Sequence, residues 1–267
     1  MINIVEIKKI EDLSALLFDQ MYDEKIKRNR SNFLYRGLPS EKYILKTSLQ
    51  RNCKNKQKEL EMSILRNFTK YTAIDDKPFF KDSVWRQMII GQHHGLPTRL
   101  LDWSYSFMVA LNFSVSVNNL DDMEKENAVV WKIDITELNQ LLPKKYQNKL
   151  QEENAYLFTV EMLNELNISL KDYDLEMSDK SIVLLEPPSI DQRIVNQYSY
   201  FSIIPMGIKS IEEYLEKETK RTCKYIIDKS LKWQIRAMLD QMNINERILF
   251  PGIDGLTRWM KRHYYVK

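Results

Sequence analysis

The sequence has few of the residues that mark secreted, metal-binding or membrane proteins. Its two cysteines, Cys53 and Cys223, lie far apart and make neither a disulfide framework nor a cysteine-based metal site. The three histidines show no HExxH spacing, so we expect no metal. The N-terminus has no apolar segment, and no apolar run approaches the ~18 residues of a membrane span. These absences predict a cytoplasmic protein with reduced thiols that does not contact a membrane.

Glycine is also scarce, with six in 267 residues, which leaves little room for flexible linkers. The sequence shows no P-loop and no Rossmann glycine pattern, so a backbone cradle for diphosphate is not expected. A GxSxG nucleophile motif is absent too. Neither sign of charge dominates, since 40 Lys and Arg face 37 Asp and Glu. The resulting net charge of +3 does not favour bulk electrostatic binding of nucleic acid.

Hydrophobic spacing predicts an α+β protein, because helices lead and strands recur later without regular alternation. The predicted helices cover residues 10–28, 56–72, 83–94, 104–118, 156–167, 211–217, 231–242 and 253–263. The predicted strands cover 32–37, 129–135, 181–185, 198–204 and 224–227, and 144–155 is predicted to be a polar surface loop. We expect one compact domain over residues 1–267, with helices packed around a small mixed or antiparallel sheet. Its motif-bearing core spans residues 30–120 and an α+β part spans 125–267.

Rare residue types concentrate in one segment, from Trp85 to Ser106. It holds two of the six glycines, two of the three histidines, two of the five tryptophans and two arginines. The pattern predicts a helix that ends at Gly95, a short irregular loop, and a second helix. A loop held between two buried elements is suited to present polar groups to a ligand.

This segment also resembles a known family. The block Gln92-His93-His94-Gly95-Leu96-Pro97-Thr98-Arg99-Leu100-Leu101-Asp102-Trp103, together with Tyr35-Arg36-Gly37 upstream, is similar to the two motifs of the FRG domain. The segment from Leu249 to Leu256 is similar to the family's closing segment. The resemblance covers residues 30–120, and more loosely 185–260. It implies a bacterial protein in a defence-related or toxin-like context.

Several polar residues in these motifs have two open interpretations. Arg36 follows three bulky residues at a strand end, so it needs an internal carboxylate or carbonyl, or a ligand phosphate or carboxylate. Arg99 either pairs with Asp102 to brace the loop or contacts a phosphate. Trp103 is either core or a stacking platform for a base or nicotinamide ring. Adjacent helical residues point about 100° apart, so at most one of the two loop histidines faces a site.

The order of these residues is similar to the ADP-ribosyltransferase pattern. In that analogy Arg36 holds a phosphate or ribose of NAD, the loop 92–103 covers the nicotinamide, and Glu186 or Gln197 stabilises the oxocarbenium charge. The predicted catalytic residues are Arg36, His93, Glu186 and Gln197. The predicted ligand-binding residues are Tyr35, Gln92, His94, Thr98, Arg99, Asp102, Trp103 and Arg193. We expect NAD as the cofactor, no metal, and a protein or nucleic acid as a macromolecular acceptor.

The alternative is a recognition module without chemistry. Arg36, Arg99, Trp103 and Arg193 then form a pocket for a nucleotide, or a surface for a nucleic acid or protein. The C-terminal cationic run, with Trp259, Tyr264 and Tyr265 interleaved, is either a solvated helix end or a site for single-stranded nucleic acid.

Overall fold

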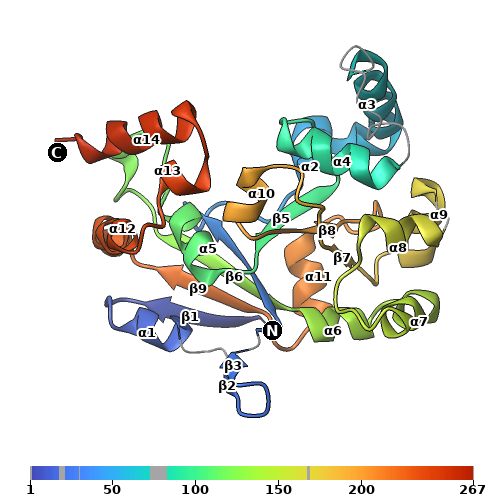
Figure 1. Cartoon of the computed structure of the whole chain (residues 1–267), viewed down its shortest axis with the longest axis horizontal. Helices are drawn as coiled ribbons and strands as arrows, with labels where there is room; N and C mark the ends of the chain where they lie inside the picture. Colours follow the sequence, from blue (N-terminus) through green and yellow to red (C-terminus); the bar gives the residue numbers. More distant parts are fainter. Residues whose placement is uncertain (1, 18–21, 30, 73–82, 167–168, 267) are drawn as a thin grey trace.

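The computed structural model describes residues 2–17, 22–29, 31–72, 83–166 and 169–266. Its centre is a seven-stranded sheet in the order β1-β9-β6-β4-β5-β8-β7 (Figure 1). β1 runs parallel to β9, and the other neighbouring pairs are antiparallel. The α+β prediction is confirmed, and the sheet is larger than expected. Its strands are β1 (Asn3–Ile7), β4 (Phe33–Leu38), β5 (Leu100–Ser104), β6 (Ala128–Asp134), β7 (Val183–Leu185), β8 (Ser199–Ile203) and β9 (Cys223–Ile227).

Helices cover both faces of this sheet. They are α1 (Asp12–Leu17), α2 (Ser48–Cys53), α3 (Gln57–Thr72), α4 (Val84–His93), α5 (Phe107–Ser114), α6 (Ile135–Gln140), α7 (Lys144–Glu152), α8 (Val160–Glu165), α9 (Leu170–Met177), α10 (Gln192–Asn196), α11 (Ile211–Glu218), α12 (Lys232–Gln241), α13 (Glu246–Leu249) and α14 (Ile253–His263). On one face, α1, α5 and α12 pack over β1, β9, β6 and β4, while α3, α4, α7, α8 and α9 pack over β5, β8 and β7 (Figure 1). The opposite face packs against α6 and α11. In the described part of the chain, no helix combines the length and the hydrophobicity needed to cross a membrane.

The two central strands β4 and β5 separate after a single pair of residues. β4 pairs with β6 along its whole length, from Phe33 to Leu38, but with β5 only at Tyr35 and Ser104. β5 in turn stays paired with β8 over its whole length. Backbone polar groups at such an opening need partners from outside the ladder. The opening lies between the two groups of helices on the same face.

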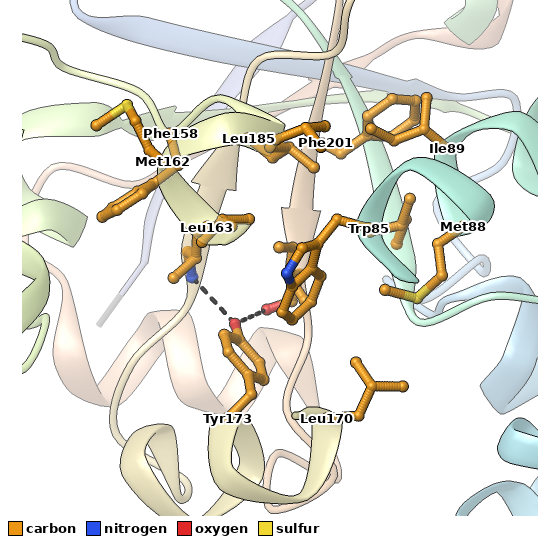
Figure 2. Packing of buried hydrophobic residues seen from close by; sticks show 14 of the residues in the cluster. Trp85, Met88, Ile89, Phe158, Met162, Leu163, Leu170, Tyr173, Leu185 and Phe201 are labelled. Carbon is orange, nitrogen blue, oxygen red and sulfur yellow. Dashed lines mark hydrogen bonds between the residues drawn. The ribbon is translucent and has the colours of Figure 1, made fainter. Parts of the chain in front are cut away.

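The core fixes the helix α4 that borders this opening. Trp85 is buried, and its ring meets that of Tyr173 edge to face at a centroid distance of 5.5 Å (Figure 2). The Tyr173 hydroxyl donates to the carbonyl oxygen of Ile203 at 2.7 Å. Ser83 caps the helix and Gly95, with φ of +87°, follows its C-cap, so the predicted helix 83–94 is confirmed. The position of the first turn of α4 is therefore set by aromatic packing in the core.

The helix predicted over residues 10–28 is wrong in its second half. Helix α1 ends at Leu17, residues 18–21 lie outside the described part, and a hairpin follows with strands β2 (Tyr22–Asp23) and β3 (Arg28–Asn29). The Asp23 carboxylate accepts from the N–H of Lys25 at 2.9 Å, and Lys27 adopts φ of +53°. This local turn competes with the helix, because the Asp side chain supplies the backbone with another partner.

Two other predicted boundaries are corrected. The predicted helix 104–118 is shorter, because Ser106 caps α5 and the helix ends at Ser114. Residues 100–104, predicted to be an irregular loop and the first residue of that helix, form β5, since pairing with β8 is a tertiary contact that local sequence does not show. The predicted loop 144–155 contains α7, whose Tyr146 and Leu150 are buried one turn apart.

Candidate functional site

A cavity of about 470 Å³ lies where β4 and β5 separate. This volume falls within the range of ordinary ligand pockets. Its walls come from β4, α2, the end of α4, β5, α5 and α10. The cavity collects seven of the residues predicted from the sequence, which are Tyr35, Arg36, Gln92, Asp102, Trp103, Arg193 and Gln197. We call this cavity the sheet pocket.

Arg36 provides a hydrogen-bond donor for a backbone carbonyl of β5 that has no partner on β4. Its Nη1 donates to the backbone carbonyl oxygen of Asp102 at 2.6 Å, and lies 3.5 Å from the carboxylate of the same residue. Its buried Nε has no hydrogen-bond partner among the described residues. Burial is the main cause that lowers the pKa of Arg36, and the charge of Arg51 adds to it, whereas Asp102 opposes it. Arg36 is thus a guanidinium with free donor capacity beside a second guanidinium.

Gln92 links the end of α4 to β5, across the loop that joins them. Its amide nitrogen donates to the Asp102 carboxylate at 3.0 Å and to the Leu100 carbonyl oxygen at 3.3 Å. Its amide oxygen accepts from the hydroxyls of Thr98 and Ser48. The amide therefore orients Asp102 toward Arg36 and ties helix α2 to the loop.

Gly37 allows the helix α5 to form the pocket wall. A Cβ atom at this position would lie 1.9 Å from the carbonyl oxygen of Ala110 and 2.5 Å from the backbone nitrogen of Ser114. No side chain fits between β4 and α5 here, so the aromatic-Arg-Gly motif requires glycine for backbone contact.

Arg99 belongs to the core and not to the sheet pocket. Its side chain is 3% exposed and forms ion pairs with Glu61 on α3 and Asp174 on α9. These contacts hold its pKa above the ordinary value, because the two carboxylates outweigh the effect of burial. The interpretation of Arg99 as an internal ion pair is supported, but its partners are not Asp102, which faces Arg36 instead.

Two further motif residues serve the fold. Trp103 is 4% exposed, packs in the apolar cluster against α11, and donates from its indole nitrogen to the Ser202 hydroxyl at 2.9 Å. Thr98 is buried, and its backbone carbonyl accepts from the N–H of Leu49 at 3.0 Å. Trp103 is therefore part of the pocket floor, and no open ring face is available for stacking.

The remaining predicted residues lie elsewhere. His93 faces Asp191 on α10, and His94 is exposed with its ring against that of His93. Burial, with help from the charge of Arg193, lowers the pKa of His93 although Asp191 opposes this. Glu186 is exposed at the end of the edge strand β7 and does not line the sheet pocket.

Sequence reasoning missed the pocket residues of α2. Ser48, Arg51 and Asn52 line the cavity, and Thr47 caps the helix in a capping box with Gln50. The Thr47-x-x-Gln50 spacing is the signal by which this short helix is recognisable. The capping box thus places Arg51 opposite the end of β4.

Gln197 joins the pocket to the C-terminal segment. Its amide nitrogen donates to the Leu249 carbonyl oxygen at 2.8 Å, and its own carbonyl accepts from the Ser104 hydroxyl at 2.7 Å. Arg193 lies on the same helix-turn, and its guanidinium is 5.1 Å from the ring centroid of Phe250.

The fold and the pocket define an α+β protein with an arginine-lined opening in its central sheet. The model of the FRG domain family matches residues 31–123, so this part of the chain is an FRG domain. Searches of curated proteins and of solved structures found no match. The match includes β4, α2, α4, β5 and α5, whereas Arg193 and Gln197 lie beyond it. The sheet pocket therefore combines the FRG domain with the part of the chain that follows it.

Proposed function

We propose that the sheet pocket binds a nucleotide-like anion. The main support for this proposal is that two cations, Arg36 and Arg51, lie near each other in the pocket. In addition, the buried Nε of Arg36 has no hydrogen-bond partner among the described residues. Arg193 is a third cation on the wall, whereas Asp102 is the one carboxylate among the described residues that line the cavity. Like charges brought together in a partly buried site favour an anion, and the guanidinium fork suits phosphate oxygens.

The rest of the lining suits the uncharged parts of a nucleotide. The amide group of Asn52 and the hydroxyl of Ser199 supply donors and acceptors for ribose and base. Phe113 and Leu96 supply apolar wall. Small-molecule sites commonly combine apolar walls with a few convergent polar groups in this way.

For the chemistry, we propose NAD consumption of the ADP-ribosyltransferase type, in a defence-related or toxin-like role. The bond between nicotinamide and ribose breaks with its electrons on nicotinamide, and an acceptor oxygen or nitrogen joins the ribose and loses a proton. Asp102, rather than the distant Glu186, is then the carboxylate that stabilises the positive charge on the ribose. The support for this assignment is that Asp102 and the phosphate-binding arginines line one cavity.

Binding and turnover are separable in the test. Calorimetry with ADP and with adenosine is expected to show that ADP binds wild type and that adenosine, which lacks phosphate, binds far more weakly. Arg36→Ala should lose ADP binding, whereas Arg86→Ala, an arginine of α4 paired with Glu161 at 2.8 Å, should keep it. Equal ADP binding by wild type and Arg36→Ala would overturn the binding proposal.

NAD turnover is then measured with and without cell lysate as a source of acceptor. Wild type should release nicotinamide, and both Arg36→Ala and Asp102→Ala should not, with thermal melts to show that each variant is folded. Expression of wild type should slow bacterial growth more than expression of Arg36→Ala does. ADP binding without any NAD turnover would remove the enzymatic proposal and leave the recognition module.

A further inference from the structure

A second basic cavity lies next to the sheet pocket. It measures about 380 Å³ and is formed by the end of α5, the loop after it, and α12, α13 and α14. Its lining includes four cations, Arg236, Arg258, Lys261 and Arg262, and one carboxylate, Glu246. We call it the C-terminal cavity. In Figure 1, α13 and α14 lie together at the end of the molecule where the chain terminates.

A buried arginine is built into the wall of the C-terminal cavity. Arg236 is 3% exposed, and its Nη2 donates to the hydroxyl of Ser116 at 3.1 Å and to Glu246. Its Nε has no hydrogen-bond partner among the described residues. Burial lowers the pKa of Arg236 to about 10, and the charge of Arg262 contributes although Glu246 opposes it. The cavity therefore repeats the arrangement at Arg36, a buried guanidinium with spare donor capacity beside further cations.

The two cavities are linked through Phe250. A third cavity of about 410 Å³ lies at this residue and shares Arg193 with the sheet pocket and Arg258 with the C-terminal cavity. The guanidinium groups of Arg193 and Arg258 are each 5.1 Å from the centroid of the Phe250 ring. Phe113, which lines both outer cavities, meets Phe250 edge to face at 6.0 Å. Cations and aromatic rings are thus neighbours where the three cavities meet.

Several cations of these three cavities are not neutralised. Among the residues that the structure describes, Arg51, Arg193, Arg258 and Lys261 form no ion pair with a carboxylate. The middle cavity does contain two acids, of which Asp191 is engaged by His93 and Asp254 is exposed. Phosphates are therefore expected at the two outer cavities, and a less charged part of the ligand at the middle one.

We propose that these three cavities bind one strand of nucleic acid. The phosphates contact the cations of the outer cavities, and a base stacks at the Phe250 ring in the middle. Alternating cationic and aromatic groups are the general means of binding single strands, because each base has a flat face and each link a negative charge. An acidic peptide would use the cations but would gain nothing from the half-buried Phe250 ring. The binding itself does not depend on the NAD reaction proposed for the sheet pocket.

The test uses the full chain and fluorescein-labelled 12-nucleotide DNA and RNA single strands. Anisotropy is measured at 50 and 200 mM NaCl, with a 12-base-pair duplex and poly-glutamate as competitors. Single strands should bind, and binding should weaken with salt in proportion to the phosphates contacted. Arg258→Ala combined with Lys261→Ala should weaken binding about tenfold and flatten the salt dependence. The matched control, Lys171→Ala with Lys180→Ala, removes two exposed cations near α9 and should change affinity less than twofold.

Two further measurements separate this proposal from the one for the sheet pocket. The Arg258→Ala/Lys261→Ala variant should bind ADP as wild type does, because neither residue lines that pocket. Phe250→Leu should weaken oligonucleotide binding while leaving binding of inorganic polyphosphate unchanged. The proposal is overturned if single strands do not bind, if the control variant loses as much affinity, or if poly-glutamate competes as well as an oligonucleotide.

Discussion

Arg36 donates from Nη1 to the backbone carbonyl of Asp102 at 2.6 Å and lies 3.5 Å from the carboxylate of the same residue. The guanidinium thereby bridges the two central strands where their ladder has ended. Only one of its nitrogens is used for this purpose, and the Arg36 side chain remains 18% exposed. The same contact therefore stabilises the open sheet and leaves the cation accessible to a ligand.

Replacing Asp102 with Asn should separate ligand binding from turnover. The neutral amide keeps an oxygen for the Gln92 hydrogen bond but no longer attracts Arg36 electrostatically. Because the Asp102 carboxylate is 53% exposed, its pair with Arg36 contributes about 0.2–1 kcal/mol. The affinity for ADP should therefore rise by a factor between about 1.4 and 5. NAD turnover should fall, because the positive charge on the ribose loses its carboxylate. Weaker ADP binding in this variant would show that Asp102 itself helps to hold the ligand.

Arg99→Met should destabilise the fold strongly. It leaves the carboxylate of Glu61, which is 4% exposed, without its cation, and removal of one partner of a buried pair costs about 3–5 kcal/mol. Arg86→Met is the matched control, because its partner Glu161 has a side chain 61% exposed and the pair should contribute less than about 1 kcal/mol. Urea unfolding of the two variants compares them directly. Similar losses would contradict the structural role assigned to Arg99.

Gly37→Ala should be far more damaging than Gly95→Ala. The first substitution drives a methyl group into the backbone of α5, at 1.9 Å from the Ala110 carbonyl oxygen. Overpacking typically costs about 1–3 kcal/mol, and here the nearest atoms are backbone that moves only with the helix. Gly95 has no atom within 4 Å of the added Cβ, so its variant is affected only by the strain of its φ of +87°. Denaturation curves and ADP affinity should both rank the variants in this order.

The contribution of His93 to stability should depend on pH. Burial lowers its pKa in the folded state, so the unfolded chain binds the proton more tightly. The contribution is therefore fully present above about pH 6.5, the ordinary value, and is lost as the pH falls through the folded-state pKa. The difference in unfolding free energy between wild type and His93→Gln should shrink from pH 7.5 to pH 5. A difference that grows toward acid would mean that the pair with Asp191 raises the pKa instead.

Elements whose signals are local can be predicted from the sequence. The Ser83 cap and Gly95 delimit α4, the alternation along Ala128–Asp134 gives β6, and the FRG motifs mark residues of the pocket. It also indicated that Arg36 needs a partner, because a guanidinium among bulky residues must be satisfied. These inferences depend on backbone propensity and on burial periodicity, and both can be read from a short segment of sequence.

Contacts between residues far apart in the sequence determine which interpretation of each polar residue holds. Arg99 finds Glu61 and Asp174, which lie 38 and 75 residues away, and this distant pairing leaves Asp102 for Arg36. β5 is a strand because β8 pairs with it, although the sequence predicts a short irregular loop before the helix at this place. The separation of β4 from β5, and the pocket within it, exist only once both strands have distant partners. Long-range pairing, rather than local preference, therefore creates the site.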